Sequence, residues 1–256
     1  MSAPVVELRD VHLSFGEKKI LTGVNLTVPE GARLVVMGQS GGGKSTLLRL
    51  ILGILPPTSG EVFFKGHSIT RMSRRRLNQM RQRMGMVYQY SALISSLSVR
   101  DNLALPLEEL TRKPRAEIDA LVDEKLALVG MADARDKMPG ELSGGMRKRV
   151  GLARGIIMAP QLILYDEPSA GLDPVISSVI NELMISLSEK ISATSIIVTH
   201  EMESAFKVAT HMAMLFQGSI IAAGTPEEFK GSDHPVVAQF ITGDTRGPIL
   251  EGTATP

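Results

Sequence analysis

The N-terminal part of the chain alternates between apolar and polar residues, and this period-two pattern predicts β-strands. Apolar residues occupy every second position from 11 to 15, and the alternation returns in residues 24–28 after a turn at 16–19. Alternating strands bury one face and expose the other. Pro29 and Gly31 end the second run. We therefore expect an antiparallel β-region at the start of the chain.

Further along the chain the apolar runs are short and continuous, which is typical of buried strands. These runs are residues 34–37, 84–88, 162–165 and 195–199. A run at 62–64 predicts one more short strand, and residues 212–216 and 219–222 flank Gly218 as a predicted hairpin. Together they predict the sheet of an α/β fold.

Helical periodicity replaces the strand pattern between residues 90 and 160. Apolar residues recur at helical spacing in 99–110 and 116–129, and Gly130 stops the second segment. We therefore expect a mostly helical subdomain, at about 90–160, inserted in one α/β domain that spans residues 1–242.

Two more helices and a tail are expected in the C-terminal part. Asp173 is a predicted N-cap, with Pro174 at the first helical position. The apolar side of this helix consists of Val175, Ile176, Val179, Ile180, Leu183, Met184 and Leu187. Residues 235–242 predict a short helix. Residues 243–256 are rich in Gly, Thr and Pro and lack periodicity, so we expect a tail that is disordered or packed on a partner.

Composition narrows the possible classes of function. The chain has 256 residues, a net charge of +1 and no cysteine. This length allows a sizeable core, the charge argues against nucleic acid as the main ligand, and the lack of cysteine suits a reducing cytosol. No signal peptide is visible, and no apolar run approaches about 20 residues. A role at a membrane would therefore require a partner.

Arginine is concentrated in residues 71–83. The default interpretation is a solvated helix face, because charged side chains usually stay in water. The alternative, a contact with a partner or with anionic lipid headgroups, stays open.

The strongest motif is a glycine-rich loop between the predicted strand 34–37 and an apolar segment, residues 47–52, that opens a helix. The loop fits G-x-x-x-x-G-K-[ST], and its residues are Gly38, Gln39, Ser40, Gly41, Gly42, Gly43, Lys44, Ser45 and Thr46. Such a unit aims backbone N–H groups and a helix N-terminus at one place, which binds phosphate. Lys44 would reach the β- and γ-phosphates of a nucleoside triphosphate, and the Ser45 hydroxyl would ligate Mg²⁺.

Two carboxylates follow the predicted strand 162–165. Asp166 and Glu167 are expected at the carboxyl edge of the sheet, where open α/β folds bind ligands. An aspartate there can hold Mg²⁺, and an adjacent glutamate can orient and deprotonate an attacking water. Alone, Asp-Glu-Pro predicts only a turn. In a chain with a phosphate loop, the catalytic interpretation is favoured.

A second phosphate-binding helix N-terminus is predicted at Ser143, Gly144, Gly145 and Met146, in a helix that we expect to run to Met158. Taken alone, Ser-Gly-Gly is more often a helix cap. One chain does not need two such sites for one triphosphate. We therefore expect a two-fold dimer, in which this segment closes over the nucleotide bound to the neighbouring chain's phosphate loop.

Taken in order, these motifs resemble the ATPase subunits of ABC transporters. Besides the phosphate loop, the resemblance rests on Gln89, residues 142–146, Asp166 with Glu167, a D-loop at 169–173, and His200. It covers residues 5 to about 230. It implies an ABC-type P-loop NTPase fold with a mixed β-sheet core, an N-terminal antiparallel β-region and an inserted helical subdomain, and it implies an ATP sandwich dimer.

The resemblance also implies roles for single residues. Phe15 matches the aromatic residue that stacks on adenine, Gln89 would sense Mg²⁺ and the water, and His200 would contact the γ-phosphate. By themselves, Phe15 would be a core residue and His200 a hydrogen-bonded histidine at a strand end.

Within that family the chain looks most like the Mla/Mce-type lipid-transport ATPases. The similarity rests on Met146, where most ABC ATPases have glutamine, and on residues 91–107 and 237–248. A thioether cannot donate hydrogen bonds as an amide does, so we expect a looser nucleotide contact at Met146.

The resemblance implies an ATP- and Mg²⁺-dependent ATPase subunit of a lipid transporter in a bacterial envelope. It would lie on the cytoplasmic face of the inner membrane and dock on integral membrane permease subunits through residues 89–107. Two alternatives remain. The same ATPase could serve another solute, such as amino acids or metals, or the chain could be a soluble ABC ATPase that acts on ribosomes or DNA. The latter proteins commonly carry two ATPase units or a long coiled coil, and the sequence shows neither, so we expect no nucleic-acid partner.

Overall fold

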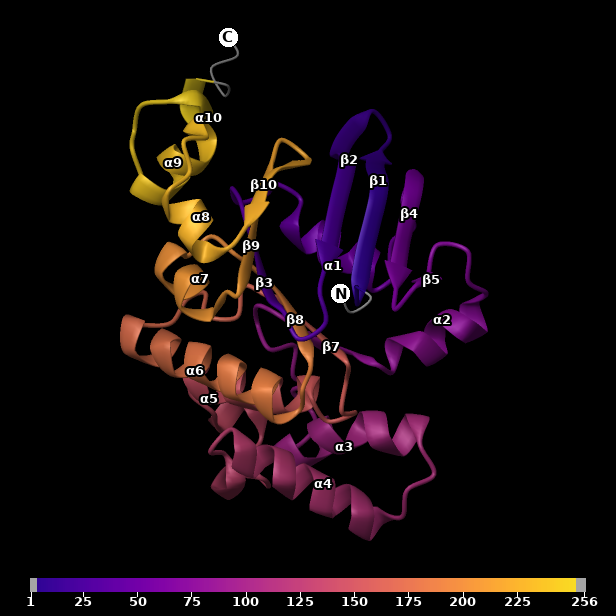
Figure 1. The fold of residues 1–256 in the computed structure, drawn as a ribbon. Helices are drawn as coiled ribbons and strands as arrows, with labels where there is room; N and C mark the ends of the chain where they lie inside the picture. Colours follow the sequence, from indigo (N-terminus) through magenta and orange to yellow (C-terminus); the bar gives the residue numbers. More distant parts are fainter. Residues whose placement is uncertain (1–3, 252–256) are drawn as a thin grey trace. The chain divides into compact units, whose positions relative to one another are not determined.

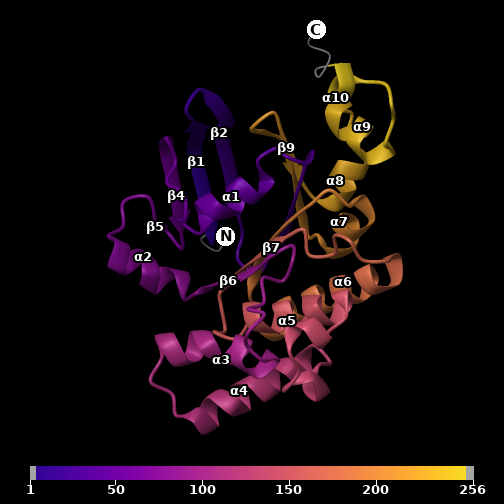
Figure 2. The same ribbon diagram turned by 180° about the vertical axis from the view of Figure 1, so that it is seen from behind.

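The computed structural model describes residues 4–251, which fall into two units. The first unit contains the described residues up to Met72 and those from Val198 onward, and the second unit is Ser73–Ile197. Figure 1 and Figure 2 show the elements of each unit from opposite sides. In residues 4–251 no helix combines the length and the apolar character needed to cross a bilayer.

The first unit begins with an antiparallel sheet, as predicted. Its strands, in spatial order, are β2 (Lys18–Val28), β1 (Val6–Phe15), β4 (Ser59–Phe64) and β5 (His67–Ser68). Val6 lies opposite Val28 on one side and Phe64 on the other, and all three side chains are buried. The period-two alternation therefore places one face of this sheet in the core.

The same unit holds a second group of strands with mixed directions. Here β3 (Arg33–Met37) pairs in parallel with β9 (His211–Phe216), and β9 pairs antiparallel with β10 (Ser219–Gly224). Gly218 forms the hairpin turn with φ +80°, and its carbonyl accepts a hydrogen bond from Thr22 of β2 at 2.8 Å. The predicted hairpin is confirmed. The helices of this unit are α1 (Lys44–Ile51), α7 (Met202–Val208), α8 (Pro226–Lys230), α9 (Pro235–Thr242) and α10 (Pro248–Glu251).

The segment after α9 differs from the expected irregular tail. The buried Gln239 side chain accepts a hydrogen bond from the Ile249 N–H at 2.8 Å and donates one to the Asp244 carbonyl at 3.1 Å. One amide thus supplies the donor and the acceptor that fold residues 244–249 back onto α9. The expectation of disorder is wrong for residues 243–251, and residues 252–256 lie outside the described part of the chain.

The second unit contains the predicted helical region between two parallel strands. Its elements in chain order are α2 (Arg74–Arg81), β6 (Met84–Val87), α3 (Val99–Leu110), α4 (Arg115–Leu128), the 3₁₀ helices η1 (Ala132–Ala134) and η2 (Pro139–Glu141), α5 (Gly144–Gly155), β7 (Leu162–Asp166), α6 (Pro174–Lys190) and the first part of β8 (Thr194–Thr199). Strand β6 pairs in parallel with β7. The helix predicted to reach Met158 ends at Gly155, because Ile156 leaves the helical conformation as the C-cap.

Helix α6 begins at the N-cap that the sequence predicted. The Asp173 carboxylate caps it by accepting hydrogen bonds from the Val175 and Ile176 N–H groups, each at 3.0 Å. Ile180 is buried as predicted, but Val175 is 72% exposed and does not belong to the buried face. Helix α2, with no buried residue, is the exposed arginine-rich helix that the sequence predicted.

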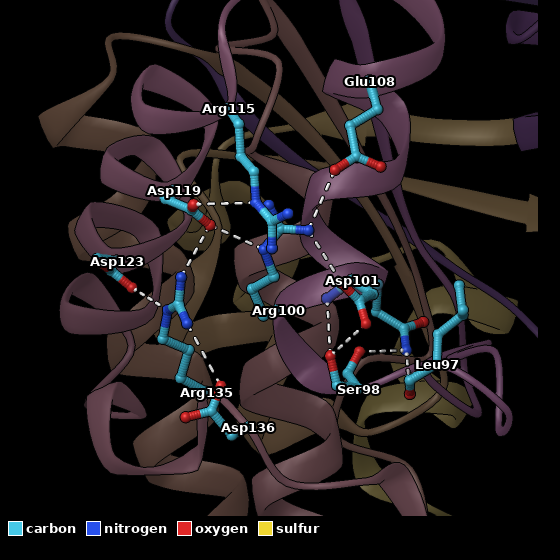
Figure 3. Close-up of polar contacts among 11 residues, drawn as sticks. Leu97, Ser98, Arg100, Asp101, Glu108, Arg115, Asp119, Asp123, Arg135 and Asp136 are labelled. Carbon is cyan, nitrogen blue, oxygen red and sulfur yellow. Dashed lines mark hydrogen bonds and ion pairs between the residues drawn. The ribbon is translucent and has the colours of Figure 1, made fainter.

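A buried arginine joins the helices of the second unit (Figure 3). The Arg100 side chain, 10% exposed, contacts Asp119 of α4 at 2.8 Å, Asp101 at 2.9 Å and Glu108 at 3.1 Å. Arg135, from the turn after η1, shares Asp119 at 2.8 Å. The hydrogen bond from Arg100 lowers the pKa of Asp119 from its ordinary value. One guanidinium therefore ties α3 to α4 through charge-assisted bonds.

We expect Arg100→Leu to lower the free energy of unfolding by about 2 kcal/mol, because it removes the buried member of an ion network whose carboxylates are partly exposed. The measurement is urea denaturation at pH 7. Arg115→Leu is the matched control, because Arg115 faces the same Asp119 at 3.8 Å but is 84% exposed. A loss of less than about 0.5 kcal/mol is expected for this exposed pair. Equal losses in the two variants would contradict the role given to Arg100.

Candidate nucleotide-binding and hydrolysis site

The glycine-rich loop lies in the first unit, between β3 and α1. Gly43 is the residue before α1 and has φ +96°, a left-handed conformation that suits glycine. Gly38 has φ +155°, and a Cβ atom there would lie 2.2 Å from the Leu215 carbonyl oxygen of β9. The loop therefore runs so close to β9 that only glycine fits at position 38.

Lys44 folds back over this loop. Its side chain is buried, and its Nζ donates hydrogen bonds to the carbonyls of Gly38 at 2.7 Å and of Gln39 at 3.0 Å. Ser45 and Thr46 follow in the first turn of α1 and are half-buried. The ammonium is thus placed at the helix N-terminus, where its positive charge and the positive end of the helix dipole favour a phosphate.

Phe15 and His200 belong to the same unit. Phe15 ends β1 and is 54% exposed, so it is not the core residue that its type alone would suggest. An exposed aromatic ring is available for stacking on a base. His200 is exposed and follows β8 directly, at a turn where the Thr199 hydroxyl accepts a hydrogen bond from the Glu201 N–H at 3.1 Å.

The acidic residues and Gln89 lie in the second unit. Asp166 is the last residue of β7 and is half-buried, and Glu167 is 8% exposed with φ +48°. A left-handed glutamate is uncommon and points to a backbone held by its surroundings. Gln89 follows the end of β6, the strand that neighbours β7, so both acids and Gln89 lie at the carboxyl ends of adjacent parallel strands.

Lys148 connects these residues, and the sequence reading missed it. Its buried Nζ donates to the Gln89 carbonyl at 2.5 Å and to the Glu167 carbonyl at 3.4 Å. The sequence signal that could have identified Lys148 is its helical spacing from two glycines, because Lys148, Gly151 and Gly155 lie on one side of α5. Two small residues at that spacing indicate close packing of the helix face that carries the lysine.

The segment 143–146 forms the start of α5. Ser143 is the N-cap, and its hydroxyl accepts a hydrogen bond from the Met146 N–H at 3.3 Å. Ser143 and Gly144 are exposed, whereas Met146 is half-buried and lines a cavity of about 310 Å³ together with Arg149 and Ile176. The helix N-terminus is therefore accessible to an anion, with a cationic side chain beside it.

The two groups of predicted site residues thus belong to different units. The first unit carries Phe15, the glycine-rich loop and His200, and the second carries Gln89, the α5 N-terminus, Asp166 and Glu167. The role of each residue stays a prediction.

Comparison with known proteins identifies the class. The family model for the ABC transporter matches residues 21–170, so the chain belongs to the ABC transporter family, in which it is an ATPase. Solved structures agree. The ATP-binding cassette MJ0796, a dimer in a post-hydrolysis state with ADP and Pi, is 30% identical with a TM-score of 0.79 and covers 86% of this chain and 98% of that one. CbiO1 of Clostridium perfringens, part of the transporter complex cbiONQ, is 29% identical with a TM-score of 0.84 over 90% of this chain and 92% of that one.

Among curated proteins, the chain is similar to ATP-binding subunits of two named systems. It is 40% identical to the intermembrane phospholipid transport system ATP-binding protein MlaF of Escherichia coli, over 96% of this chain and 92% of that protein. It is 43% identical to the "Probable ribonucleotide transport ATP-binding protein mkl" of Mycobacterium tuberculosis, over 95% of this chain and 68% of that protein. The predicted fold class and the dimeric ABC cassette family are confirmed.

We expect Gly38→Ala to lower the free energy of unfolding by about 2 kcal/mol and to weaken ATP binding, because its Cβ would clash with the Leu215 carbonyl oxygen and push the loop out of the position in which Lys44 binds it. Gly41→Ala is the matched control, because Gly41 has φ +76° but a Cβ there meets no other atom within 4 Å. It should cost about 1 kcal/mol from backbone strain alone. Denaturation and fluorescent-ATP titration measure both effects. Equal ATP affinities in the two variants would contradict the close approach of the loop to β9.

Proposed function

We propose that the chain is the ATPase subunit of a bacterial membrane transporter that moves phospholipid, and that residues 1–242 form its single ABC ATPase domain. The observation that carries this proposal is the similarity to MlaF, which extends over 96% of this chain and 92% of that protein. A similarity of that length includes the helical region and the C-terminal helices, not only the nucleotide motifs. The protein named MlaF in Haemophilus influenzae supports the same assignment at 40% identity over 97% of this chain.

The site residues divide the work of binding and hydrolysis. Lys44 and the N–H groups of residues 38–46 bind the β- and γ-phosphates, and Phe15 stacks on the adenine. Glu167 accepts a proton from the attacking water, and Gln89 and His200 hold the water and the γ-phosphate in place. The low exposure of Glu167 keeps this carboxylate away from bulk water.

Magnesium fits the donor types at this site. Residues 4–251 contain no group of three or more His, Cys, Asp or Glu that could hold a metal by themselves. Ser45, Gln89 and Asp166 offer a hydroxyl, an amide and one carboxylate oxygen, and Mg²⁺ is usually bound by one or two carboxylates together with substrate phosphates. When bound, the ion would neutralise charge on the β- and γ-phosphates.

We infer that two chains complete the site. The dimeric ABC cassettes among the similar structures support this inference. In the dimer, the segment 143–146 of each chain, in which Ser143 and Gly144 are exposed, closes over the triphosphate bound to the loop of its neighbour. Hydrolysis removes the γ-phosphate contacts that hold the two chains together, so the dimer opens.

A hydrophobic groove in the second unit is the proposed dock for the membrane subunits. It has a volume of about 480 Å³ and is bordered by β6, α3 and the end of α5. Ile94 is 41% exposed and Leu110 is 51% exposed at its margin, and Tyr88 lies beside Gln89. An apolar groove of this size suits a short helix of a partner. A chain docked in this way would lie on the cytoplasmic face of the inner membrane.

The ribonucleotide transport named for the mycobacterial relative is the second candidate function. The identity to that protein is 43%, but this chain spans 68% of its length. The ATPase chemistry is the same in both cases, so the two functions differ in the membrane partner and the cargo. The net charge of +1 gives no support for a nucleic-acid partner.

We expect Glu167→Gln to reduce kcat for ATP hydrolysis by about a hundredfold or more while ATP binding stays intact, because it removes the base and not the phosphate contacts. The measurement is steady-state ATPase activity, with size-exclusion chromatography in ATP to detect an accumulated dimer. Glu182→Gln, on the exposed side of α6, is the control and should behave as wild type. Wild-type turnover in Glu167→Gln would refute the assigned base, and the lack of an ATP-bound dimer would argue against the sandwich.

We expect Ile94→Asp to abolish copurification of the chain with its membrane subunits from detergent-solubilised membranes. A partner that docks in the groove would have to bury the unpaired carboxylate, which is costly. ATPase activity of the isolated chain should change little. Ile54→Asp is the control, since Ile54 is 51% exposed and lies in the other unit.

Lipid analysis of the same copurified complex tests the cargo. Bound phospholipid supports the proposed function, whereas a complex without lipid that binds a ribonucleotide or another polar solute tightly would favour the second candidate.

A further inference from the structure

Helix α5 carries two cations, the buried Lys148 and the half-buried Arg154, that bind backbone carbonyls. Lys148 donates to the carbonyls of Gln89 and Glu167, at 2.5 and 3.4 Å. Arg154 donates to the carbonyls of Ser91 at 2.7 Å and Ala92 at 2.6 Å. Burial lowers the pKa of the Arg154 guanidinium from its ordinary value. The same helix thus binds three carbonyls of the segment after β6, in residues 89–92, and one carbonyl of the turn after β7, in Glu167.

The close approach of α5 to these segments depends on glycine. A Cβ at Gly151 would lie 3.2 Å from the Ser91 Cβ, and a Cβ at Gly155 would lie 2.7 Å from the Val87 Cγ2. On the other side of the contact, a Cβ at Gly85 would lie 2.1 Å from the Gly155 carbonyl oxygen. The helix therefore packs backbone against backbone on β6, which leaves little freedom for the cations that it carries.

The carbonyls that the cations hold belong mostly to strained residues. Ser91, Ala92 and Glu167 have φ values of +60°, +47° and +48°. This conformation costs a residue with a Cβ atom about 1 kcal/mol. Hydrogen bonds from a charged donor are stronger than those between neutral groups, so they offset this cost. The backbone of Glu167 would relax more readily without Lys148.

We propose that Lys148 is a positioning residue for ATP hydrolysis, which sets the Glu167 carboxylate relative to Gln89 by holding both backbones on one ammonium. The proposal rests on the proposed role of Glu167 as the base. The ammonium donates to the Gln89 carbonyl and, more weakly at 3.4 Å, to the Glu167 carbonyl. A displacement of the Gln89 segment would therefore move the ammonium with it and change its hold on Glu167.

This arrangement gives the docking groove a direct route to the catalytic base. Tyr88 and Arg154 both line the groove. Tyr88 directly precedes Gln89 in sequence, and Arg154 donates a hydrogen bond to the carbonyl of Ser91, two residues after Gln89. A partner helix that enters the groove acts on the segment whose carbonyl Lys148 binds. Lys148 then transmits the docked state to Glu167 without contacting the nucleotide.

The test is a set of substitutions at position 148 in the full chain, assayed for ATPase activity and ATP binding. We expect Lys148→Met to lower kcat by at least about tenfold, because a small misplacement of a catalytic group can cost up to about a hundredfold. KM and the Kd for ATP should change by less than about twofold, since no phosphate contact is removed. Lys148→Arg, which keeps the charge and the donors, should restore most of kcat, and Lys148→Gln should restore less.

Lys125→Met is the matched control, because Lys125 is also 7% exposed, lies in the same unit on α4 and pairs with Glu124. It should leave kcat unchanged. Thermal unfolding identifies any variant that does not fold. If Lys148→Met is unfolded, the test is the comparison of kcat between Lys148→Arg and Lys148→Gln. A higher kcat in Lys148→Arg supports the proposal, and equal values in these two folded variants overturn it.

The double variant Lys148→Met with Glu167→Gln separates the two hypotheses. If Lys148 acts through Glu167, the double variant is no slower than Glu167→Gln alone. A folded Lys148→Met with wild-type kcat beside an inactive Glu167→Gln would overturn the positioning role and leave the base assignment intact. Wild-type activity in Glu167→Gln would instead refute the base itself.

Discussion

Buried cations that bind backbone carbonyls are the interaction on which the functional segments of this protein depend. Lys44 holds the phosphate loop in the first unit, and Lys148 and Arg154 hold the segments around Gln89 and Glu167 in the second. An ammonium or guanidinium group removed from water has to find acceptors. Carbonyls of irregular backbone lack the hydrogen-bond donors that a helix or sheet would supply. One contact therefore gives the cation an acceptor and the carbonyl a donor. These side chains thereby restrict the conformations of the segments that they hold.

The arginine between α3 and α4 meets the same need in a different way. Arg100 is surrounded by carboxylates, so its charge is neutralised locally and its effect is to join helices. Lys148 instead donates hydrogen bonds to the backbone carbonyls of Gln89 and Glu167. The first cation joins helices, and the second holds the backbone of residues that are predicted to handle a polyanionic substrate.

Local signals explain which parts of the fold the sequence could predict. The helix predicted over 99–110 has the observed bounds of α3, because Ser98 caps its first turn through the Asp101 N–H. The helix over 235–242 is likewise α9, which starts at a proline and ends at Gly243 in the left-handed conformation. The phosphate loop and the two acids were also found from local pattern. Lys148 was missed because its partner Gln89 lies 59 residues away in sequence, and the helical spacing of Lys148, Gly151 and Gly155 indicates a packed face without naming its partner.

The hydrogen bonds of Gln239 extend the packed part of the chain beyond α9. Because this buried amide takes its partners from Asp244 and Ile249, the packed part of the first unit extends beyond α9 to those residues. A chain cut at 242 would keep every nucleotide motif, yet it would leave an amide donor and acceptor unsatisfied in the interior, at a cost of about 1–3 kcal/mol. The final turn is therefore part of the fold, and a fusion partner or tag is compatible with it only beyond that turn.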